Sequence, residues 1–392
     1  MPDSGSRRPP GRREESFAYN GRMFLRSLSL ENFRNYPALD LAFDRRKVIL
    51  LGDNAQGKTN LLEAIALLAT GVSPFATREQ EAIRWEAESA ILRSVVEREL
   101  GPVGIDLLFK ANGRRAIRVN GLYQKRLGDL LGQVKVVLFA ASDLPLVKGA
   151  PAERRRYLDG ILMQLTPTYF TILSHYQRVL TQRNNVLRQI QEGASAEQLA
   201  IWDEQLAHYG AQVMTRRAEL IERLRPRAAG WHGAIAGAGE TLTMGLIPSI
   251  PIDDQDPETA LREALTTGRS RDLARGQTMV GPHRDDLELA IDGHAARSYA
   301  SQGQQRTIVL ALKLAELETF RQEAGEPPLL LLDDVLAELD IRRQNALLAA
   351  IGPDVQTFVT STHLSDFTAA WIEEASVFSV HRGAVKPFVK AF

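Results

Sequence analysis

The chain has 392 residues, of which 24% are charged and 44% hydrophobic, with 48 basic and 48 acidic side chains and no net charge. This balance is typical of a globular protein of two or three domains, and it excludes a uniformly basic nucleic-acid binder but not a local basic patch. The absence of cysteine excludes disulfides, cysteine nucleophiles, iron–sulfur clusters and thiolate zinc sites. The lack of cysteine also fits a cytoplasmic protein, which we expect. Because no run of 18 apolar residues occurs, we expect no membrane span.

The N-terminal segment, residues 1–22, is basic. It carries arginine at positions 7, 8, 12, 13 and 22 but no apolar run. A secretory signal would need an apolar core of about 7–15 residues after its basic start. We predict a disordered, mildly basic tail; a presequence and a mis-assigned start are the alternatives.

The folded part is predicted to open with strands. Segments 28–30 and 39–43 alternate apolar and polar residues, which indicates antiparallel strands. Lys47–Leu51 (KVILL) is a continuous apolar run typical of a strand buried in a central sheet, and apolar residues at helical spacing follow it after a glycine-bounded loop. Residues 90–120 predict further strands, with Asn112-Gly113 as a two-residue hairpin turn.

Long helices are predicted from residue 151 to about residue 226. Apolar residues keep a spacing of three and four through 173–190, with an interruption at Arg183, and through 206–224 after a break at 193–195. The pattern predicts a short helical hairpin that packs on a core, too short for a coiled-coil rod.

Glycine and proline are frequent in 230–256, where the pattern does not predict a defined element. Beyond residue 287 the chain returns to alternating helices and strands. The predicted elements are a helix at Gln302–Glu323, a strand at Leu329–Asp333, a helix at 341–351 and a strand at Thr357–Ser361.

Residues 52–59 read GDNAQGKT and match the phosphate-binding pattern GxxxxGK[ST] without a mismatch. In this pattern Lys58 reaches the β- and γ-phosphates, the Thr59 hydroxyl coordinates Mg²⁺, and backbone N–H groups at the helix N-terminus face the phosphates. The strand before the loop and the helix after it favour this interpretation over a chance glycine-rich turn. The pattern therefore predicts a site for ATP and Mg²⁺ formed by Gly52, Asp53, Asn54, Ala55, Gln56, Gly57, Lys58 and Thr59.

Two acids follow the apolar strand at 329–333. Asp333 would hold Mg²⁺ through water, and Asp334 would polarise the water that attacks the γ-phosphate. The alternative is that the two acids only cap the next helix. Together with the phosphate loop, the pair indicates slow hydrolysis of ATP to ADP and phosphate.

Two later segments resemble parts of ATP-binding-cassette ATPases. Glu338, Leu339 and Asp340 resemble the loop that crosses the dimer interface in those proteins. His363 follows the next strand, where the same superfamily places a histidine that touches the γ-phosphate. A structural histidine is the alternative.

A third resemblance concerns the start of the helix at Gln302–Glu323. Ser301, Gly303 and Gln304 match the LSGGQ signature of ATP-binding-cassette proteins, with Gln302 in place of a glycine. The alternative is an ordinary helix N-cap. In that superfamily the signature contacts the γ-phosphate of the partner's nucleotide, so the resemblance implies a homodimer that ATP closes with two-fold symmetry.

The long interval between the phosphate loop and the signature, residues 60–300, implies an inserted second lobe. Heads of SMC-type proteins are split in this way, but this chain has neither their long coiled coil nor a CxxC hook. Four segments look like hallmarks of the RecF family, and the similarity extends from residue 24 to residue 384. They are 28–36 (LSLENFRNY), 143–159 (DLPLVKGAPAERRRYLD), 281–287 (GPHRDDL) and 333–340 (DDVLAELD).

On these residues the chain is identified as a member of the RecF family. The resemblance implies an α/β fold with an ATP-binding-cassette-type P-loop ATPase head. The head would consist of residues 23–140 and 281–392, and a mainly helical lobe would be inserted at residues 141–280. It implies a protein of DNA repair, replication and recombination that binds duplex DNA next to single-stranded gaps when loaded with ATP. It also implies work with RecO and RecR in loading the RecA recombinase, and a part in the SOS response.

Two other functions stay open at this point. The chain could be the energising ATPase subunit of a transporter or another partner complex, or a DNA-binding scaffold without catalysis. Two assignments are open as well. Gln124 and Gln133 are candidates for the glutamine that senses Mg²⁺, and the arginines at 154–156 either contact phosphates or form an ion-paired first helical turn.

Overall fold

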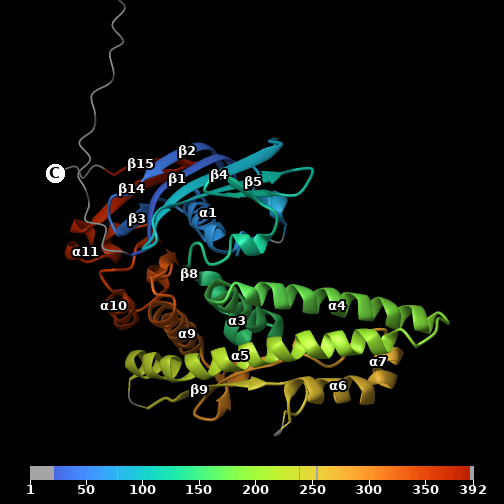
Figure 1. Ribbon diagram of the computed structural model, residues 1–392. Coiled ribbons are helices and arrows are strands. Elements are labelled where there is room, and N and C mark those ends of the chain that lie inside the picture. The colour runs from blue at the N-terminus through green and yellow to red at the C-terminus, as the bar shows by residue number, and fades with distance from the viewer. Residues whose placement is uncertain (1–21, 77, 238, 253–254, 389–392) are drawn as a thin grey trace, which may run out of the picture.

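The computed structural model describes residues 22–76, 78–237, 239–252 and 255–388, so the predicted tail lies outside the described residues except for Arg22. Figure 1 shows two lobes. The sheet lobe (residues 22–140 and 329–388) stands above the helical lobe (residues 151–275). The α/β class with a mainly helical second lobe is confirmed. None of the helices in the described ranges combines the length and apolarity needed to cross a membrane.

The outer sheet of the sheet lobe is antiparallel, with strand order β2-β1-β4-β5-β6-β7. The predicted pairing of its first two strands is confirmed. The predicted two-residue turn is wrong, because residues 111–115 connect β5 to β6. Such a turn needs a positive φ at both central residues, and here Gly113 has one (133°) but Asn112 does not. The strands are β1 Phe24–Phe33, β2 Tyr36–Ala42, β4 Ser89–Glu97, β5 Val103–Lys110, β6 Ala116–Val119 and β7 Leu122–Gln124.

The inner sheet has the order β15-β14-β3-β13-β12-β8 and is parallel apart from its edge strand β15. The predicted bounds of β3, β12 and β13 are confirmed. Both faces of this sheet are covered, which explains the continuous apolar runs: Val48 and Leu50 belong to one core and Ile49 to another. The strands are β3 Lys47–Leu51, β8 Val136–Ala140, β12 Leu329–Asp333, β13 Thr357–Ser361, β14 Ala375–His381 and β15 Ala384–Pro387.

Helix α1 (Lys58–Thr70) lies between these two sheets (Figure 1). It contacts β8, β12 and β13 of the inner sheet, and its apolar residues share a core with strands of the outer sheet. This burial fixes the first turn of α1 against the end of the central strands. The phosphate loop is therefore attached to rigid elements on both sides.

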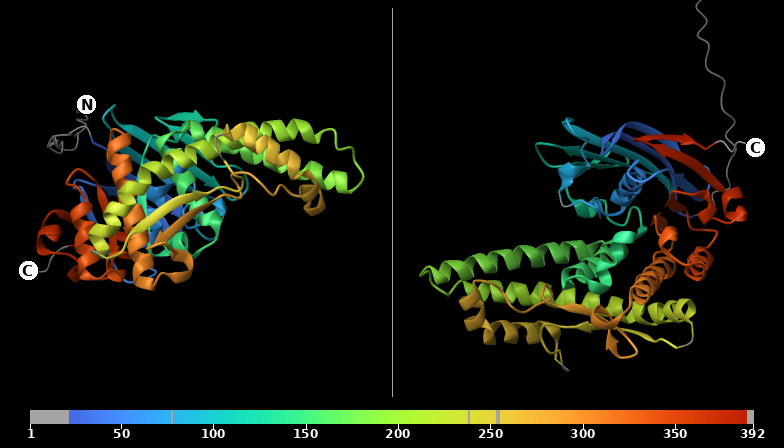
Figure 2. Two further views of the ribbon diagram at one scale, coloured as in Figure 1. Left: turned by 90° about the horizontal axis from the view of Figure 1, so that it is seen from below. Right: turned by 180° about the vertical axis from the view of Figure 1, so that it is seen from behind.

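Helices form most of the second lobe, and α4 and α5 pair as the predicted antiparallel hairpin. Seen from below in Figure 2, this hairpin extends far beyond the sheet lobe on one side. The expected end of the helices near residue 226 is wrong, since α5 continues through Pro226 to Ala236. A proline inside a helix costs about 3 kcal/mol, and burial of Leu224, Ala228 and Ile235 outweighs it. The helices are α3 Pro151–Leu165, α4 Thr168–Gln191, α5 Leu199–Ala236, α6 Pro257–Thr267 and α7 Arg269–Arg275.

The interruption of the apolar spacing at Arg183 has a structural cause. This guanidinium is fully buried, and it donates to Asp203 at 2.7 Å and to Asp272 at 2.7 Å. A buried arginine is tolerated only when carboxylates neutralise it. The pair of acids thus ties α4 to α5 and α7.

A small sheet accompanies the helices. In it β9 (Leu242–Ile247) pairs antiparallel with β10 (Asp286–Ile291), which pairs with β11 (His294–Ala295). Strand β9 lies where the sequence pattern predicts no defined element, because its partner comes from much later in the chain. The predicted domain boundary at 280 stays a prediction, although β9 and β10 pair across it.

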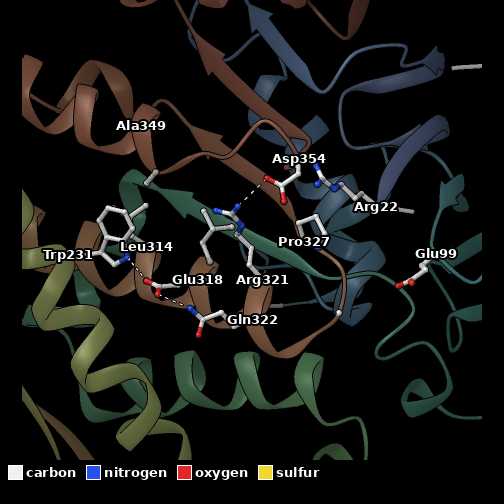
Figure 3. Close-up of a pocket in the computed structure, with 13 residues that line it drawn as sticks. Arg22, Glu99, Trp231, Leu314, Glu318, Arg321, Gln322, Pro327, Ala349 and Asp354 are labelled. Atoms are coloured by element: carbon white, nitrogen blue, oxygen red, sulfur yellow. Dashed lines mark hydrogen bonds and ion pairs between the residues drawn. The ribbon is translucent and has the colours of Figure 1, made fainter. Parts of the chain in front are cut away.

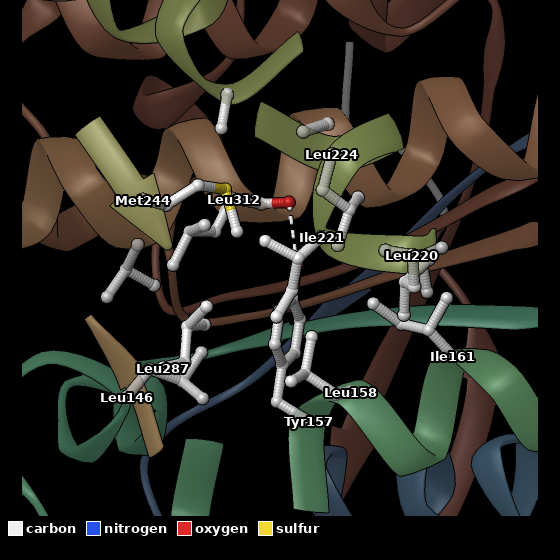
Figure 4. Close-up of a cluster of buried hydrophobic side chains, with 14 of the residues drawn as sticks. Leu146, Tyr157, Leu158, Ile161, Leu220, Ile221, Leu224, Met244, Leu287 and Leu312 are labelled. Carbon is white, nitrogen blue, oxygen red and sulfur yellow. Dashed lines mark hydrogen bonds between the residues drawn. The ribbon is translucent and has the colours of Figure 1, made fainter. Parts of the chain in front are cut away.

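Helix α9 (Gln302–Glu323) connects the lobes, as it packs against both α5 and β8. In the core beneath it, shown in Figure 4, the Tyr157 hydroxyl donates to the Leu312 carbonyl at 3.0 Å. Leucine and isoleucine side chains of α3 and α5 surround this contact. The remaining helices are α2 Pro145–Lys148, α8 Ala296–Tyr299, α10 Ile341–Ala350 and α11 Ala369–Glu373.

Candidate nucleotide site and signature

The phosphate loop joins β3 to α1 in a conformation that needs glycine at one position. Gly57 has a φ of 114° and is buried. A Cβ atom there would lie 2.4 Å from the Asn35 side-chain nitrogen, closer than non-bonded atoms can approach. The loop can therefore be this tight only with glycine at residue 57.

Two turns hold the loop from outside. At the start of β2, the Tyr36 hydroxyl donates to the Gly57 carbonyl at 2.9 Å, and from the turn before it the Asn35 amide donates to the Gln56 carbonyl at 3.0 Å. From the turn between β14 and β15, the Arg382 N–H donates to the Gln56 side chain at 2.8 Å. The Gln56 side chain thus faces this turn, and the part of residue 56 in the nucleotide site stays a prediction. Asn35 and Tyr36 were missed as site residues, although they lie in a segment that resembles the RecF family.

A cavity of about 630 Å³ opens beside the loop. Gly52, Asp53 and Gln56 do not line it, and Gly52 packs instead against β14, where a Cβ would meet the Val380 carbonyl at 2.3 Å. The loop side of the cavity consists of Asn54, Ala55, Gly57, Lys58, Thr59 and Asn60. The opposite side consists of Ala141, Asp334, Ala337, Glu338 and Thr362.

Lys58 is buried, with 4% of its surface exposed, at the base of this cavity. Its ammonium group donates to the carbonyls of Gly52 at 2.7 Å and Asp53 at 3.1 Å, and lies 3.9 Å from the Asp334 carboxylate. A cation held by carbonyl groups beside a cavity is suited to exchange them for phosphate oxygens.

Thr59 and Asp333, the two residues that the sequence predicts to hold Mg²⁺, contact each other directly. The Thr59 hydroxyl lies 2.9 Å and 3.0 Å from the two carboxylate oxygens of Asp333. Burial raises the pKa of Asp333, while hydrogen bonds from Thr59 and Thr360 act in the opposite direction. Hydroxyl and carboxylate oxygens are the ligands that Mg²⁺ prefers, so these two residues fit a magnesium site.

Thr360, at the end of β13, is a site residue that sequence reasoning missed. Its hydroxyl lies 3.0 Å from Asp333 and 3.3 Å from Asp334, and it accepts the Asp334 N–H at 2.8 Å. A hydroxyl has one proton, so Thr360 donates to one acid at a time. Asp334 has a φ of 53°, a left-handed conformation that aspartate and asparagine tolerate better than most residues.

His363 is exposed and does not line the cavity, although its neighbour Thr362 does. Its backbone N–H donates to the Ser361 hydroxyl at 3.1 Å. Contact between this side chain and a γ-phosphate stays a prediction.

The signature residues lie at the start of α9 and form a helix cap. The Ser301 hydroxyl accepts the Gln304 N–H at 3.2 Å, and the Gln304 side chain accepts the Ser301 N–H at 2.8 Å. Glu240, from the segment after α5, accepts the other end of the Gln304 amide at 3.0 Å. Ser301, Gly303 and Gln304 do not line the cavity beside Lys58. Within one chain, the capping alternative therefore describes the contacts of Ser301.

The signature is nevertheless bonded to the loop that follows the two acids. Arg343 of α10 donates to the Gly303 carbonyl at 3.2 Å and to the Thr307 hydroxyl at 2.9 Å. Arg306 donates to the carbonyl of Glu338, which lines the cavity, at 2.8 Å. The two candidate half-sites of one chain are thus physically connected.

The two candidates for the glutamine that senses Mg²⁺ lie outside the cavity. Gln124 lies on the edge strand β7 and Gln133 accepts from Arg98 at 3.4 Å, and neither lines the cavity. At the end of β8 the cavity is lined by Ala141 instead.

The arginines at 154–156 are all paired within the protein. Arg154 forms two bonds with Asp286, at 2.6 and 2.8 Å, Arg155 donates to the Asp285 carbonyl at 2.7 Å, and Arg156 pairs with Glu153. Arg154 and Arg156 are therefore ion-paired, whereas Arg155 binds a backbone carbonyl. Contact of these arginines with phosphates stays a prediction.

A larger cavity of about 810 Å³ lies elsewhere, between α5, α9 and α10 (Figure 3). Its polar groups pair with one another: Trp231 donates to Glu318 at 2.9 Å and Arg321 to Asp354 at 3.2 Å. No residue of the phosphate loop and neither of the two acids lines it. Size alone therefore does not identify the nucleotide site.

Three features define an ATP-binding-cassette-type P-loop ATPase head. They are the glycine-bounded loop after the central parallel strand β3, the acid at the end of β12, two strands away, and the separate signature helix α9. The family model described as RecF/RecN/SMC N terminal domain matches residues 24–386. The DNA replication and repair protein RecF of Synechococcus sp. (strain JA-3-3Ab) is 50% identical over 372 residues, which cover 93% of this chain and 98% of that protein. RecF of Gloeobacter violaceus (strain ATCC 29082 / PCC 7421) is 48% identical over 368 residues, with the same coverage. This chain belongs to the RecF family.

Solved structures agree with this assignment. A structure of the recombination mediator protein RecF-ATP in the RecFOR pathway matches with a TM-score of 0.87 and 34% identity, covering 94% of this chain and 98% of that chain. The Smc head domain with a coiled coil and joint from Pyrococcus yayanosii matches with a TM-score of 0.54 and 14% identity, covering 94% and 97%. The second likeness concerns the fold alone.

Proposed function

We propose that this chain is an ATP-dependent DNA-binding protein of replication and recombinational repair, which forms a dimer around ATP. The observation that carries the proposal is the pairing of Thr59 with Asp333 beside the cavity, while Ser301 lies outside that cavity. This arrangement supports a site that a second copy of the chain would complete. The RecF relatives, described as DNA replication and repair proteins, support the biological role.

Nucleotide binding would use the cavity beside the phosphate loop. Backbone N–H groups at the start of α1 and the Lys58 ammonium group would bind the phosphates of ATP. Thr59 and Asp333 would hold Mg²⁺, which neutralises phosphate charge when bound. Asp334 would accept a hydrogen bond from the attacking water and polarise it, giving slow hydrolysis to ADP and phosphate.

ATP would close the dimer because it binds the closed state better than the open one. In the closed state each nucleotide would contact Lys58 of one copy and Ser301 of the other. The bonds from Arg306 and Arg343 would keep the signature in register with the loop after Asp334. Two-fold symmetry would then produce two identical composite sites.

The DNA substrate and the partners form the finer part of this proposal. The dimer would bind duplex DNA next to single-stranded gaps and act with RecO and RecR to load the RecA recombinase, with a part in the SOS response. It would do so in the cytoplasm. The support is the likeness to a protein described as a recombination mediator in the RecFOR pathway.

A transporter ATPase subunit is not favoured by any observation. The likeness to RecF proteins extends over 93% of this chain. A scaffold without catalysis would leave the contact between Thr59 and Asp333, and that between Lys58 and Asp334, without a role.

Sedimentation velocity tests the proposal. We expect a monomer without nucleotide, a dimer with ATP and Mg²⁺, and a faster complex when a gapped duplex is added. Lys58→Ala is the control and should stay monomeric in all three conditions. A wild-type protein that binds ATP but neither dimerises nor binds DNA would contradict the proposal.

A further inference from the structure

One segment of this neutral chain is strongly and uniformly basic. Residues 110–126, KANGRRAIRVNGLYQKR, contain no acidic residue. The basic residues of this segment are Lys110, Arg114, Arg115, Arg118, Lys125 and Arg126. The nucleotide site uses none of them.

The structure places this segment at one edge of the outer sheet. It includes the end of β5, the loop 111–115, β6 and the edge strand β7. In Figure 1 the end of β5 and the loop that follows it lie at the opposite end of the sheet lobe from α11. We call residues 110–126 the basic edge.

Most cations of the basic edge have no acidic partner. Lys110, Arg114, Lys125 and Arg126 are exposed, and no ion pair joins them to any residue that the structure describes. Arg115 differs, because it donates to the Gly71 carbonyl and pairs with Glu79 at 3.2 Å, which anchors the loop to the end of α1.

Helix α5 differs from the basic edge in its charge pairing. Its exposed arginines are neutralised by nearby glutamates: Arg216 pairs with Glu219 and Arg225 with Glu222. A cluster of like charges without counterions costs electrostatic free energy, which an anionic partner would recover. The basic edge is therefore arranged for an external anion.

The exposed apolar groups of the basic edge favour a nucleic acid over a small anion. Tyr123 is 65% exposed, and the Arg118 guanidinium lies 4.1 Å from the centre of its ring. Leu122 beside it is 70% exposed. Unpaired cations around an exposed aromatic ring suit a sugar-phosphate backbone, where the cations meet phosphates and the ring meets sugars.

We propose that the basic edge binds the phosphodiester backbone of DNA. This inference rests on the proposed function and assigns its DNA contact to a surface distant in sequence from the signature. The contact would be independent of base sequence, because phosphates carry no sequence information. Dimerisation would bring a second basic edge to the same complex, so affinity for DNA should rise when ATP closes the dimer.

The test is the salt dependence of binding to a fluorescein-labelled DNA duplex, measured by anisotropy on the full chain with ATP. In the triple variant Arg114→Ala/Lys125→Ala/Arg126→Ala we expect affinity to fall tenfold or more. The slope of log affinity against log salt should decrease by about 0.9 for each phosphate that the variant no longer neutralises. ATP affinity and the ATP-dependent dimer should be unchanged. The charge-retaining variant Arg114→Lys/Lys125→Arg/Arg126→Lys should bind like the wild type.

A matched control removes three exposed arginines from the helical lobe, Arg178→Ala/Arg271→Ala/Arg275→Ala, and should retain most of the affinity and slope. An equal loss in this control would mean that net charge and not the basic edge matters, which overturns the proposal. Unchanged DNA binding in the first triple variant also overturns the proposal. Aggregation of that variant would also count against it, because the charges would then serve to protect an open sheet edge. If the wild type itself does not bind DNA, the proposed function fails and not the choice of surface.

Discussion

The phosphate loop and the signature are both helix N-termini that resemble anion sites, but the chain treats them differently. Around the loop, Asn35 and Tyr36 donate to backbone carbonyls, and the Arg382 N–H donates to the Gln56 side chain. From neighbouring strands, Asp333 contacts the Thr59 hydroxyl and Thr360 accepts the Asp334 N–H. At the signature, Ser301 and Gln304 cap each other on an exposed helix end, and Glu240 and Arg343 bind this cap from other segments. The residues of the candidate phosphate site are brought together within the chain, whereas Ser301 lies at an exposed helix end outside the cavity.

Because of this difference, the two regions should contribute to different binding free energies, one to ATP binding and the other to dimerisation. The buried half-site should bind ATP in a monomer, since its donors are in place before any partner arrives. The exposed half-site should matter only after dimerisation. Mutations in the two regions should therefore separate nucleotide affinity from dimer affinity.

Ser301→Arg should give the largest effect on assembly. A monomer should bind ATP almost as well as the wild type, but dimerisation and hydrolysis should fail because the bulky side chain fills the space for the partner's γ-phosphate. Equilibrium ATP binding and sedimentation check this. Mixing Ser301→Arg with Lys58→Ala chains should restore activity to at most about half of wild type, because one composite site is intact and the other has neither half. Loss of ATP binding in monomeric Ser301→Arg would place the signature in the same site as Lys58.

Asp334→Asn should slow hydrolysis by about 10²–10⁴-fold, since the group that polarises water is removed. Asparagine tolerates the left-handed φ of 53°, so the backbone should be preserved. The expected outcome in single-turnover experiments is a long-lived ATP dimer that stays on DNA. Fast turnover in this variant would show that another group polarises the water.

Lys58→Ala should weaken ATP binding by about ten- to a hundredfold, because a charge-assisted contact is worth about 1.5–3 kcal/mol. Calorimetric titration of ATP measures this directly. Lys148→Ala, which removes an exposed lysine, is the control and should bind normally. Unchanged affinity in Lys58→Ala would refute the assignment of the cavity.

Glu240→Ala should give the smallest effect of the four variants and should separate dimer affinity from ATP affinity. It removes the acceptor that orients Gln304, a hydrogen bond worth about 0.5–1.5 kcal/mol. We expect dimer affinity to fall about two- to tenfold by sedimentation, with monomer affinity for ATP unchanged. Glu288→Ala, an exposed acid on β10, is the control. An equal change in monomer ATP affinity would mean that Glu240 acts on the other half-site.

Local patterns were sufficient for the phosphate loop, the strands β3, β12 and β13, and the start of α9, because each has a strong signal within a few residues. A continuous apolar run indicates a doubly covered strand, and a glycine-lysine-threonine loop after it indicates a phosphate site. The same patterns failed at Pro226 and at the β5–β6 turn. At Pro226, burial of α5 against α9 outweighs the tendency of proline to end a helix. Between β5 and β6, Gly113 has a positive φ but Asn112 does not, so the two-residue turn does not form.

The partners of these motifs came only from folding. Thr360 could have been suspected because it lies near the end of a strand next to β12, and Asn35 and Tyr36 because they lie in a segment that resembles the RecF family. Glu240 carries no local signal of its own. Gln56, which belongs to the phosphate motif, proved to face the β14–β15 turn. The physical reason is that a motif encodes its own backbone, whereas the groups that orient it are supplied by segments that sheet pairing and core packing bring together from distant parts of the chain.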